Sequence, residues 1–139
     1  MSLDTRLVII LSSALTGAEA ANAAAVLGLA AMAHTSDIGA KAVDRDGRGY
    51  GALDRHPIPV LTAPPADLAI LHQKADADPA LAVTAFTETA RRSRDYDDYL
   101  TRLAATRSAE VEYTGLAIYG PRARVTATTK RLTLYPATS

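Results

Sequence analysis

The sequence predicts an α/β domain in which strands and helices alternate around a mostly parallel or mixed sheet. Three observations carry this prediction: short apolar runs rich in β-branched residues, longer segments with helical spacing between them, and turn-forming residues at most junctions. The 139 residues are enough for a single α/β domain, 1–139, with a core of its own. No internal repeat, linker or low-complexity tract divides the sequence.

The first predicted unit is a strand, a turn and a helix. Residues 6–11 (RLVIIL) are β-branched and apolar throughout, as in a strand that is buried on both faces. Thr16 is expected to be a helix N-cap, because Glu19 follows three residues later and completes a capping box. The helix should run from about residue 17 to residue 34. Its many alanines predict close packing against a sheet or a partner.

The rest of the chain continues the alternation. A turn is expected at Asp46-Gly47, within a small hairpin or ordered loop, and Ser93 is expected to cap a helix that buries Tyr96, Leu100 and Leu103. The tail should hold a short helical turn and a final extended piece. The later strands are predicted at residues 56–63, 80–89 and 111–120, and the later helices at residues 64–76 and 93–106.

Composition and spacing exclude several kinds of site. The net charge is zero, so RNA is left open as a partner only through a local basic patch. His34, His56 and His72 lack the spacing of metal ligands and are expected to be surface or helix-end residues. Neither a phosphate-binding loop nor a dinucleotide fingerprint is present, so no metal and no cofactor is expected. No motif marks an activated nucleophile, which leaves catalytic residues unknown.

The apolar stretches also bear on location. Residues 23–33 reach about half of the ~20 residues that a membrane-spanning helix needs, so no membrane contact is expected. Arg6 before LVIIL and the AEA at residues 18–20 imitate a secretory signal, but Asp4, Ser12 and Ser13 interrupt that pattern. The sequence therefore favours a cytoplasmic protein.

Two features suggest a binding site. Asn22 is a polar amide within an alanine-rich helix, where it can orient a ligand or hold the preceding loop. Residues 120–139 contain Arg122, Arg124, Lys130 and Arg131 and no acidic residue, which suits a phosphate or carboxylate. A solvated basic tail that faces an acidic helix explains the same charges equally well.

Residues 6–30 and 115–135, which include RLVIIL, Asn22 and TKRLTLY, resemble a family of small uncharacterised bacterial proteins, family two thousand of the domain-of-unknown-function series. That family is similar in fold to the archaeal and eukaryotic, or type-2, peptidyl-tRNA hydrolases. The resemblance implies a three-layer α/β/α domain with a four-stranded mixed sheet, often dimeric.

The hydrolases carry a lysine and a glutamine on the first helix and an aspartate and a threonine near the chain end. The matching positions here are Ala21, Ala25, Thr126 and Thr129, so only the threonine is kept. Since alanine can neither move a proton nor orient an ester, the resemblance implies the fold without this chemistry.

These observations lead to three hypotheses. The first is a small anionic or nucleotide-like ligand, bound between the start of the first helix and the basic C-terminal turn. The second is a peptidyl-tRNA or related ester hydrolase with a rebuilt site, and the third is a homodimeric interaction module that uses the first helix or a strand edge. The candidate ligand-binding residues are Thr16, Asn22, Arg122, Arg124, Thr129 and Lys130.

Overall fold

Five strands form one open mixed sheet in the order β3-β4-β1-β2-β5 in a computed structural model that describes residues 3–136. β1 pairs in parallel with β2, and the other neighbours are antiparallel. The strands are β1 (Thr5–Ser12), β2 (Val60–Ala63), β3 (Ala82–Thr87), β4 (Tyr113–Pro121) and β5 (Thr133–Leu134). The helices are α1 (Gly17–Ala31), α2 (Pro65–Asp76), α3 (Glu88–Arg92), α4 (Tyr96–Ala104), the 3₁₀ turn η1 (Ser108–Glu110) and α5 (Arg122–Thr129).

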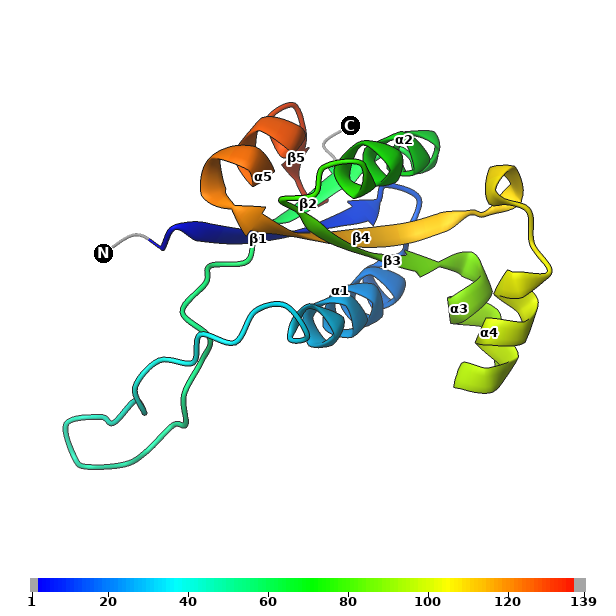
Figure 1. Ribbon diagram of the computed structural model, residues 1–139. Coiled ribbons are helices and arrows are strands. Elements are labelled where there is room, and N and C mark those ends of the chain that lie inside the picture. The colour runs from blue at the N-terminus through cyan, green and yellow to red at the C-terminus, as the bar shows by residue number, and fades with distance from the viewer. Residues whose placement is uncertain (1–2, 137–139) are drawn as a thin grey trace.

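Helices cover both faces of the sheet (Figure 1). α1 lies on one face, α2 and α5 lie on the other, and α3 and α4 extend beyond the end of β3. The alternation of β1 explains the two cores. Leu7, Ile9 and Leu11 pack with α1, whereas Val8 and Ile10 pack with residues of α2 and α5. The prediction that residues 6–11 form a strand buried on both faces is confirmed.

The capping prediction for the first helix is also confirmed. The Thr16 hydroxyl accepts a hydrogen bond from the Glu19 N–H, and the Glu19 carboxylate accepts one from the Thr16 N–H at 2.9 Å. Small residues let α1 approach the sheet closely, since its buried positions are Ala20, Ala23, Leu27 and Ala31. The helix ends at Ala31, three residues before the predicted end.

Three expectations about the later elements are wrong. The sheet has five strands instead of four, because Thr133 and Leu134 pair with β2. Asp95, not Ser93, caps α4, since its carboxylate accepts from the Asp98 N–H at 2.8 Å. Tyr96 and Leu100 are exposed and not buried, because α4 packs on α3 beyond the end of the sheet.

Residues 37–55 form a projection that we call the arm (Figure 1). Backbone hydrogen bonds join its two limbs, from the Gly39 N–H to the Leu53 carbonyl at 2.8 Å and from the Tyr50 N–H to the Ala42 carbonyl at 2.9 Å. The predicted turn at Asp46-Gly47 forms the tip, where Gly47 has a φ of 87°. The arm is therefore an ordered hairpin that extends away from the sheet.

Within residues 3–136, no helix is long and apolar enough to cross a membrane.

Candidate functional site

A crevice lies at the carboxyl ends of the two parallel strands. After β1 the chain turns to α1 on one face, and after β2 it turns to α2 on the other face. This is the arrangement in which open α/β sheets place ligands, because the diverging loops leave a hollow between them. The hollow has a volume of about 530 Å³ and includes Ser12 at the end of β1, Leu15 in the loop after it, and Pro65 at the start of α2. We call it the switch crevice.

The polar wall of the switch crevice centres on Glu88, the first residue of α3. Its carboxylate accepts hydrogen bonds from Arg91 Nη2 at 2.6 Å and Nε at 3.0 Å, and from the buried Thr114 hydroxyl at 2.8 Å. Arg91 also reaches Glu19 on α1, with 3.1 Å between Nη1 and Oε2. Glu112 lines the same wall. The cluster thus ties α1 to α3 at the mouth of the crevice.

These contacts keep the carboxylates ionised. Hydrogen bonds from Arg91 lower the pKa of Glu88 below its usual value of 4.5, against a smaller opposing effect of burial. The Thr16 N–H and hydroxyl, with a smaller effect of Arg91, lower the pKa of Glu19. Burial, followed by the charge of Asp76, raises the pKa of Tyr113, which also lines the crevice. The wall therefore presents anions at neutral pH.

Replacing Glu88 with glutamine should lower the free energy of unfolding by about 2 kcal/mol at pH 7, because the charged bonds to Arg91 and Thr114 weaken. Because the pKa of Glu88 is lower in the folded state, its ionised carboxylate stabilises the protein fully above pH 4.5, and this stabilisation is lost as the pH falls through the folded-state pKa. The difference in the free energy of unfolding between the parent and Glu88→Gln should therefore disappear in acid. Urea denaturation from pH 3 to 7 measures this difference. The control is Glu112→Gln, which should change stability by less than about 0.5 kcal/mol because Glu112 is exposed.

The residues predicted for the N-terminal half of a site have different environments. Thr16 is exposed, and its hydroxyl serves the capping box. Asn22 is also exposed on α1, next to Ala21 and away from the buried stripe. The amide therefore needs no buried partner. Of these two residues, only Thr16 adjoins the switch crevice through its neighbours Leu15 and Glu19.

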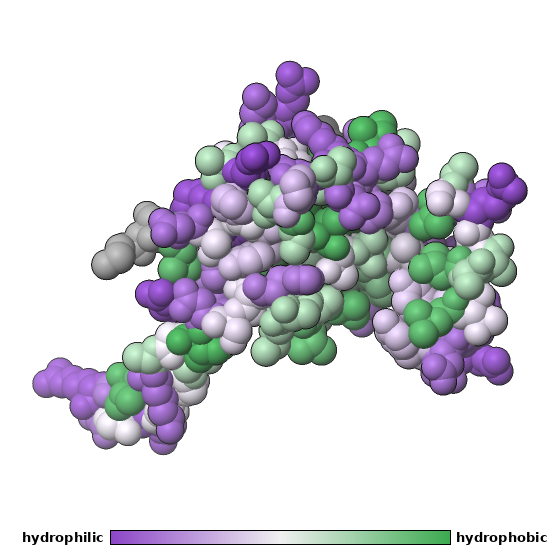
Figure 2. All heavy atoms as spheres, in the orientation of Figure 1, coloured by the Kyte–Doolittle hydropathy of each residue, from purple (hydrophilic) through white to green (hydrophobic). Residues whose placement is uncertain are grey.

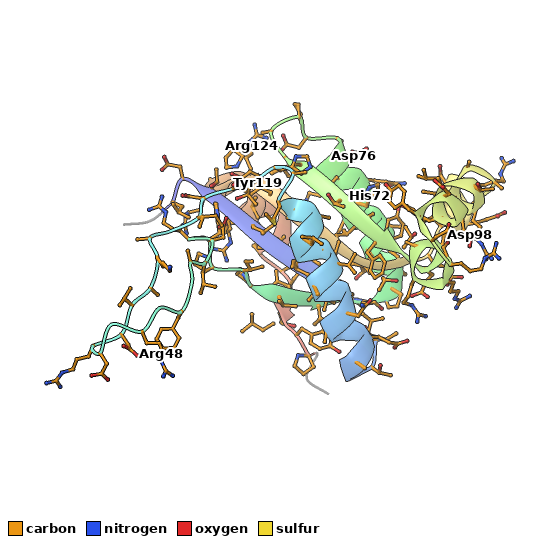
Figure 3. The ribbon with its side chains drawn as sticks, turned by 90° about the horizontal axis from the view of Figure 1, so that it is seen from below. Arg48, His72, Asp76, Asp98, Tyr119 and Arg124 are labelled. Atoms are coloured by element: carbon orange, nitrogen blue, oxygen red, sulfur yellow. The ribbon has the colours of Figure 1, made fainter. Side chains whose placement is uncertain are left out.

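The predicted basic half lies elsewhere. The Arg122 N–H donates to the Asp4 carbonyl, and Arg122 Nε donates to the Leu3 carbonyl, so α5 begins beside the first residue of β1. Arg124 pairs with Asp78 at 2.8 Å and lies near the Tyr119 end of the sheet (Figure 3). The buried Thr129 hydroxyl donates to the Val125 carbonyl, and Lys130 is exposed.

The structure does not bring the two predicted halves together. Thr16 follows the carboxyl end of β1, whereas Arg122 adjoins its amino end, about 23 Å away along an eight-residue strand. The helices that carry them also lie on opposite faces of the sheet. The same geometry separates Ala21 and Ala25 on α1 from Thr126 and Thr129 on α5. The four positions matched to the hydrolases therefore do not form one site.

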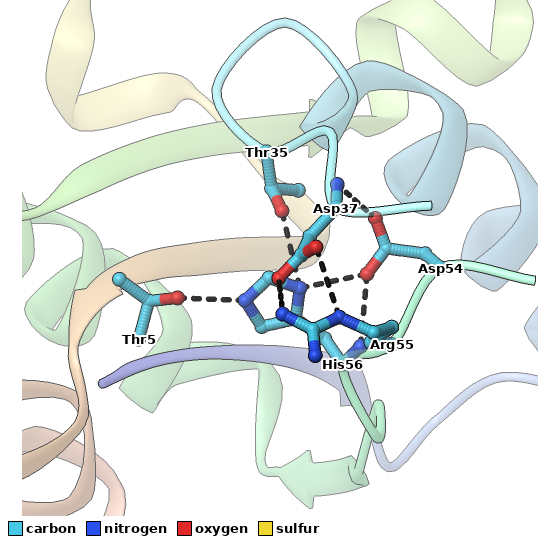
Figure 4. Close-up of polar contacts among 6 residues, drawn as sticks. All are labelled: Thr5, Thr35, Asp37, Asp54, Arg55 and His56. Carbon is cyan, nitrogen blue, oxygen red and sulfur yellow. Dashed lines mark hydrogen bonds and ion pairs between the residues drawn. The ribbon is translucent and has the colours of Figure 1, made fainter. Parts of the chain in front are cut away.

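A second polar cluster was missed by the sequence analysis, which placed His56 at the surface. His56 is buried, with only 3% of its side chain exposed. Its Nε2 lies 2.7 Å from the Thr5 hydroxyl, and its Nδ1 lies 2.7 Å from Asp54 Oδ1 and 3.2 Å from the Thr35 hydroxyl (Figure 4). Asp54 also accepts from the Asp37 N–H. We call these residues the histidine cluster.

The histidine cluster fastens the base of the arm to the sheet. Thr5 begins β1, while Thr35, Asp37 and Asp54 belong to the two limbs that lead into the arm. Arg55 and Asp37 add a bidentate ion pair at 2.9 and 3.0 Å across the same base (Figure 4). Thr5 and His56 are 51 positions apart in the sequence, so no local pattern could reveal their contact.

Among the described residues, no three His, Asp or Glu side chains converge as ligands of a metal ion.

Residues 5–136 match the model of a family described as "Protein of unknown function (DUF2000)". The chain belongs to the DUF2000 family. The family expected from residues 6–30 and 115–135 is therefore confirmed. Among curated proteins, no relative matches this DUF2000 chain.

One solved structure is similar over nearly the whole molecule. It is a protein of unknown function, Atu0240, from Agrobacterium tumefaciens strain C58. The two chains share 22% identity with a TM-score of 0.85, and the match covers 96% of this DUF2000 chain and 99% of the other. At this identity the likeness shows a common fold.

Proposed function

We propose that this DUF2000 protein binds a small organic molecule in the switch crevice, and that the molecule carries an amino group or other strong hydrogen-bond donors. The position of the crevice supports binding, since it lies where two helices diverge from adjacent parallel strands. Its volume of about 530 Å³ is within the range of small-molecule sites.

The charges favour a donor over an anion. Glu19, Glu88 and Glu112 face one guanidinium, that of Arg91, at this crevice. The N-termini of α1, α2 and the short α3 each contribute up to roughly half a positive charge. The sum remains negative, by about half a charge or more, so an amine should bind better than a phosphate. Because Arg91 already pairs with Glu19 and Glu88, Glu112 is the carboxylate we expect the ligand to meet.

The anionic or nucleotide-like ligand expected from the sequence would have to bind at the other end of the sheet, around α5. Titration of ¹⁵N-labelled protein with agmatine and, separately, with adenosine monophosphate distinguishes the two sites. Agmatine should shift amide signals of residues 12–19 and 109–113. If adenosine monophosphate instead shifts amide signals, and only those of residues 122–131, the result would support the anionic ligand and contradict our proposal.

Glu112→Gln tests the crevice directly. The substitution should weaken agmatine binding at least fivefold, because it removes a carboxylate without changing the shape of the wall. Glu110→Gln, two residues away on η1, is the matched control, since Glu110 is exposed outside the switch crevice. Equal affinities of parent and Glu112→Gln would refute the assigned role of Glu112.

The histidine cluster favours a second candidate, an ester hydrolase. A hydroxyl, an imidazole and a carboxylate in hydrogen-bond contact are the parts of a nucleophilic relay. Thr5 also lines a shallow hollow of about 330 Å³ with His34 and Tyr119. Under this proposal, N-acyl-aminoacyl-tRNA would be cleaved slowly and Thr5→Val would abolish the cleavage. Release of tRNA at the same rate by both proteins, or by neither, would remove the candidate.

We further propose that the domain shares the fold of the type-2 peptidyl-tRNA hydrolases without their chemistry. The exposed alanines at positions 21 and 25 and their separation from α5 support the second half of this proposal.

A further inference from the structure

The arm carries an unusual amount of exposed apolar surface for an ordered hairpin. Ile38, Val43, Tyr50 and Leu53 are all exposed, and 83% of Leu53 is open to solvent. Asp44 fixes the tip, because its carboxylate accepts from the Asp46 and Arg48 N–H groups and from the Tyr50 hydroxyl at 2.6 Å. An isolated two-stranded hairpin is marginally stable in water, so a surface that covers it would stabilise it.

The total surface indicates how much is left uncovered. A monomeric protein of 14.6 kDa is expected to expose about 6,900 Å². This chain exposes 8982 Å², about 2,100 Å² more than that expectation. A specific protein interface buries about 800 Å² on each partner. The excess is therefore large enough for a stable interface with a second molecule.

A groove that fits such an apolar hairpin lies on the same side of the sheet. It runs between α1, β3, α3 and α4, has a volume of about 430 Å³, and includes Val26, Ala30, Phe86, Tyr96 and Tyr99. We call it the α1–α4 groove. In Figure 2 apolar side chains gather on the lower side of the body, and a few lie among the hydrophilic side chains of the arm. In Figure 1 the arm extends on one side of α1, and α3 and α4, which border the groove, lie on the other side.

The arm as a whole has four basic and four acidic residues, but its tip and the first turn of α4 carry opposite net charges. The tip of the arm holds Lys41, Arg45 and Arg48 against Asp44 and Asp46, and Arg48 lies at its far end (Figure 3). Asp95 lines the groove and Asp97 follows it in the first turn of α4. The neighbouring Asp98 pairs with Arg94 and Arg102. A cationic tip would thus meet the acidic first turn of α4.

We infer that two copies of this chain form a dimer in which the arm of each copy packs into the α1–α4 groove of the other. The placement of arm and groove on either side of α1 permits a two-fold axis beside α1 to satisfy both contacts at once. Such a reciprocal interface closes on itself, whereas a head-to-tail contact would continue into a filament. This differs from an interface through the free edge of a strand, because the arm supplies most of the buried side chains.

Sedimentation velocity of the full-length protein from 1 to 500 μM tests the inference with three matched variants. Leu53→Glu alters the arm, Tyr96→Glu alters the groove, and Ile70→Glu alters an exposed apolar residue on α2, on the other face. The parent and Ile70→Glu should sediment as dimers. Leu53→Glu and Tyr96→Glu should each raise the dimer dissociation constant at least tenfold while the melting temperatures of the monomers stay within a few degrees.

Mixing the two disrupted variants identifies which surfaces meet. In the mixed dimer one contact joins an intact arm to an intact groove, and the other contact is disrupted on both sides. A contact already lost through one substitution loses little more through the second. The mixture should therefore associate more tightly than either variant alone. A parent that is monomeric at 500 μM, a dimer indifferent to both substitutions, or a mixture no tighter than its components would overturn the inference.

Discussion

Replacing Gly115 with valine is expected to lower the free energy of unfolding by about 3 kcal/mol or more, because the site has no room for a side chain. A Cβ atom here would lie 2.8 Å from the Ile10 carbonyl oxygen and 3.0 Å from side-chain atoms of Leu11 and Leu27. The Ile10 oxygen belongs to the neighbouring strand, so it cannot move without disturbing the β1–β4 pairing. Urea denaturation with parallel far-UV circular dichroism measures the loss.

The matched control is Gly28→Ala on α1. Apart from its chain neighbours and the backbone of α1 itself, no heavy atom lies within 4 Å of the position of its Cβ, and alanine stabilises a helix relative to glycine. We therefore expect this variant to gain about 0.5–1 kcal/mol. A loss of stability in Gly115→Val together with a gain in Gly28→Ala would show that crowding at Gly115, and not glycine replacement in general, destabilises the protein. Equal stability of Gly115→Val and the parent would mean that α1 does not press on the sheet at Leu27.

The close approach at Gly115 illustrates what the sequence could predict. Short β-branched runs and the spacing of the capping box depend on neighbours in the chain, so β1 and the start of α1 were predicted correctly. The expected helical turn and final extended piece of the tail are confirmed as α5 and β5, but the sequence could not show that Thr133 and Leu134 pair with β2 and add a fifth strand. The exposed face of α4 was mispredicted for a related reason, since its periodicity shows an apolar side but not what covers it.

The grouping of the candidate site residues depends on contacts at longer range. The sequence pattern places α1 after β1 and α5 after β4, but it does not show on which face of the sheet each helix packs. A right-handed β1–α1–β2 crossover fixes the face of α1. No such rule fixes α5, which follows an antiparallel strand. The sequence does not show whether Asn22 is buried, because α1 carries alanine on both sides and its buried stripe is hard to distinguish from its exposed one.

Part of the switch crevice has a local signal in the sequence. Glu88 was placed within a strand spanning residues 80–89, whereas it begins α3 directly after β3. The threonine before it is an N-cap, as its hydroxyl accepts from the Ala90 N–H at 3.1 Å. Recognising that cap would have placed Glu88 at an end of the sheet. Its contact with Arg91 follows from helical spacing, but its contacts with Thr114 and, through Arg91, with Glu19 depend on the fold.

Replacing His56 with alanine should cost about 3 kcal/mol of stability and loosen the arm. The change removes a buried ring that packs edge-on against Tyr119, with 5.6 Å between ring centroids. It also leaves the Thr5 hydroxyl and Asp54 carboxylate without their imidazole partner. Hydrogen exchange measures both effects. Amides of residues 37–55 should lose protection by a larger factor than those of β1 and β4, because the histidine cluster joins the arm to the sheet.

His56→Phe separates packing from hydrogen bonding. Phenylalanine can retain contact with Tyr119 but offers Asp54 and Thr5 no polar atom, so it should recover only part of the lost stability. An arm held by the polar contacts would exchange as fast in His56→Phe as in His56→Ala, while the global unfolding free energies of the two variants differ. Arm protection restored by phenylalanine would show that ring packing alone holds the base. The hydrogen bonds of Figure 4 would then have to be explained by another role, such as the relay from Thr5 to Asp54.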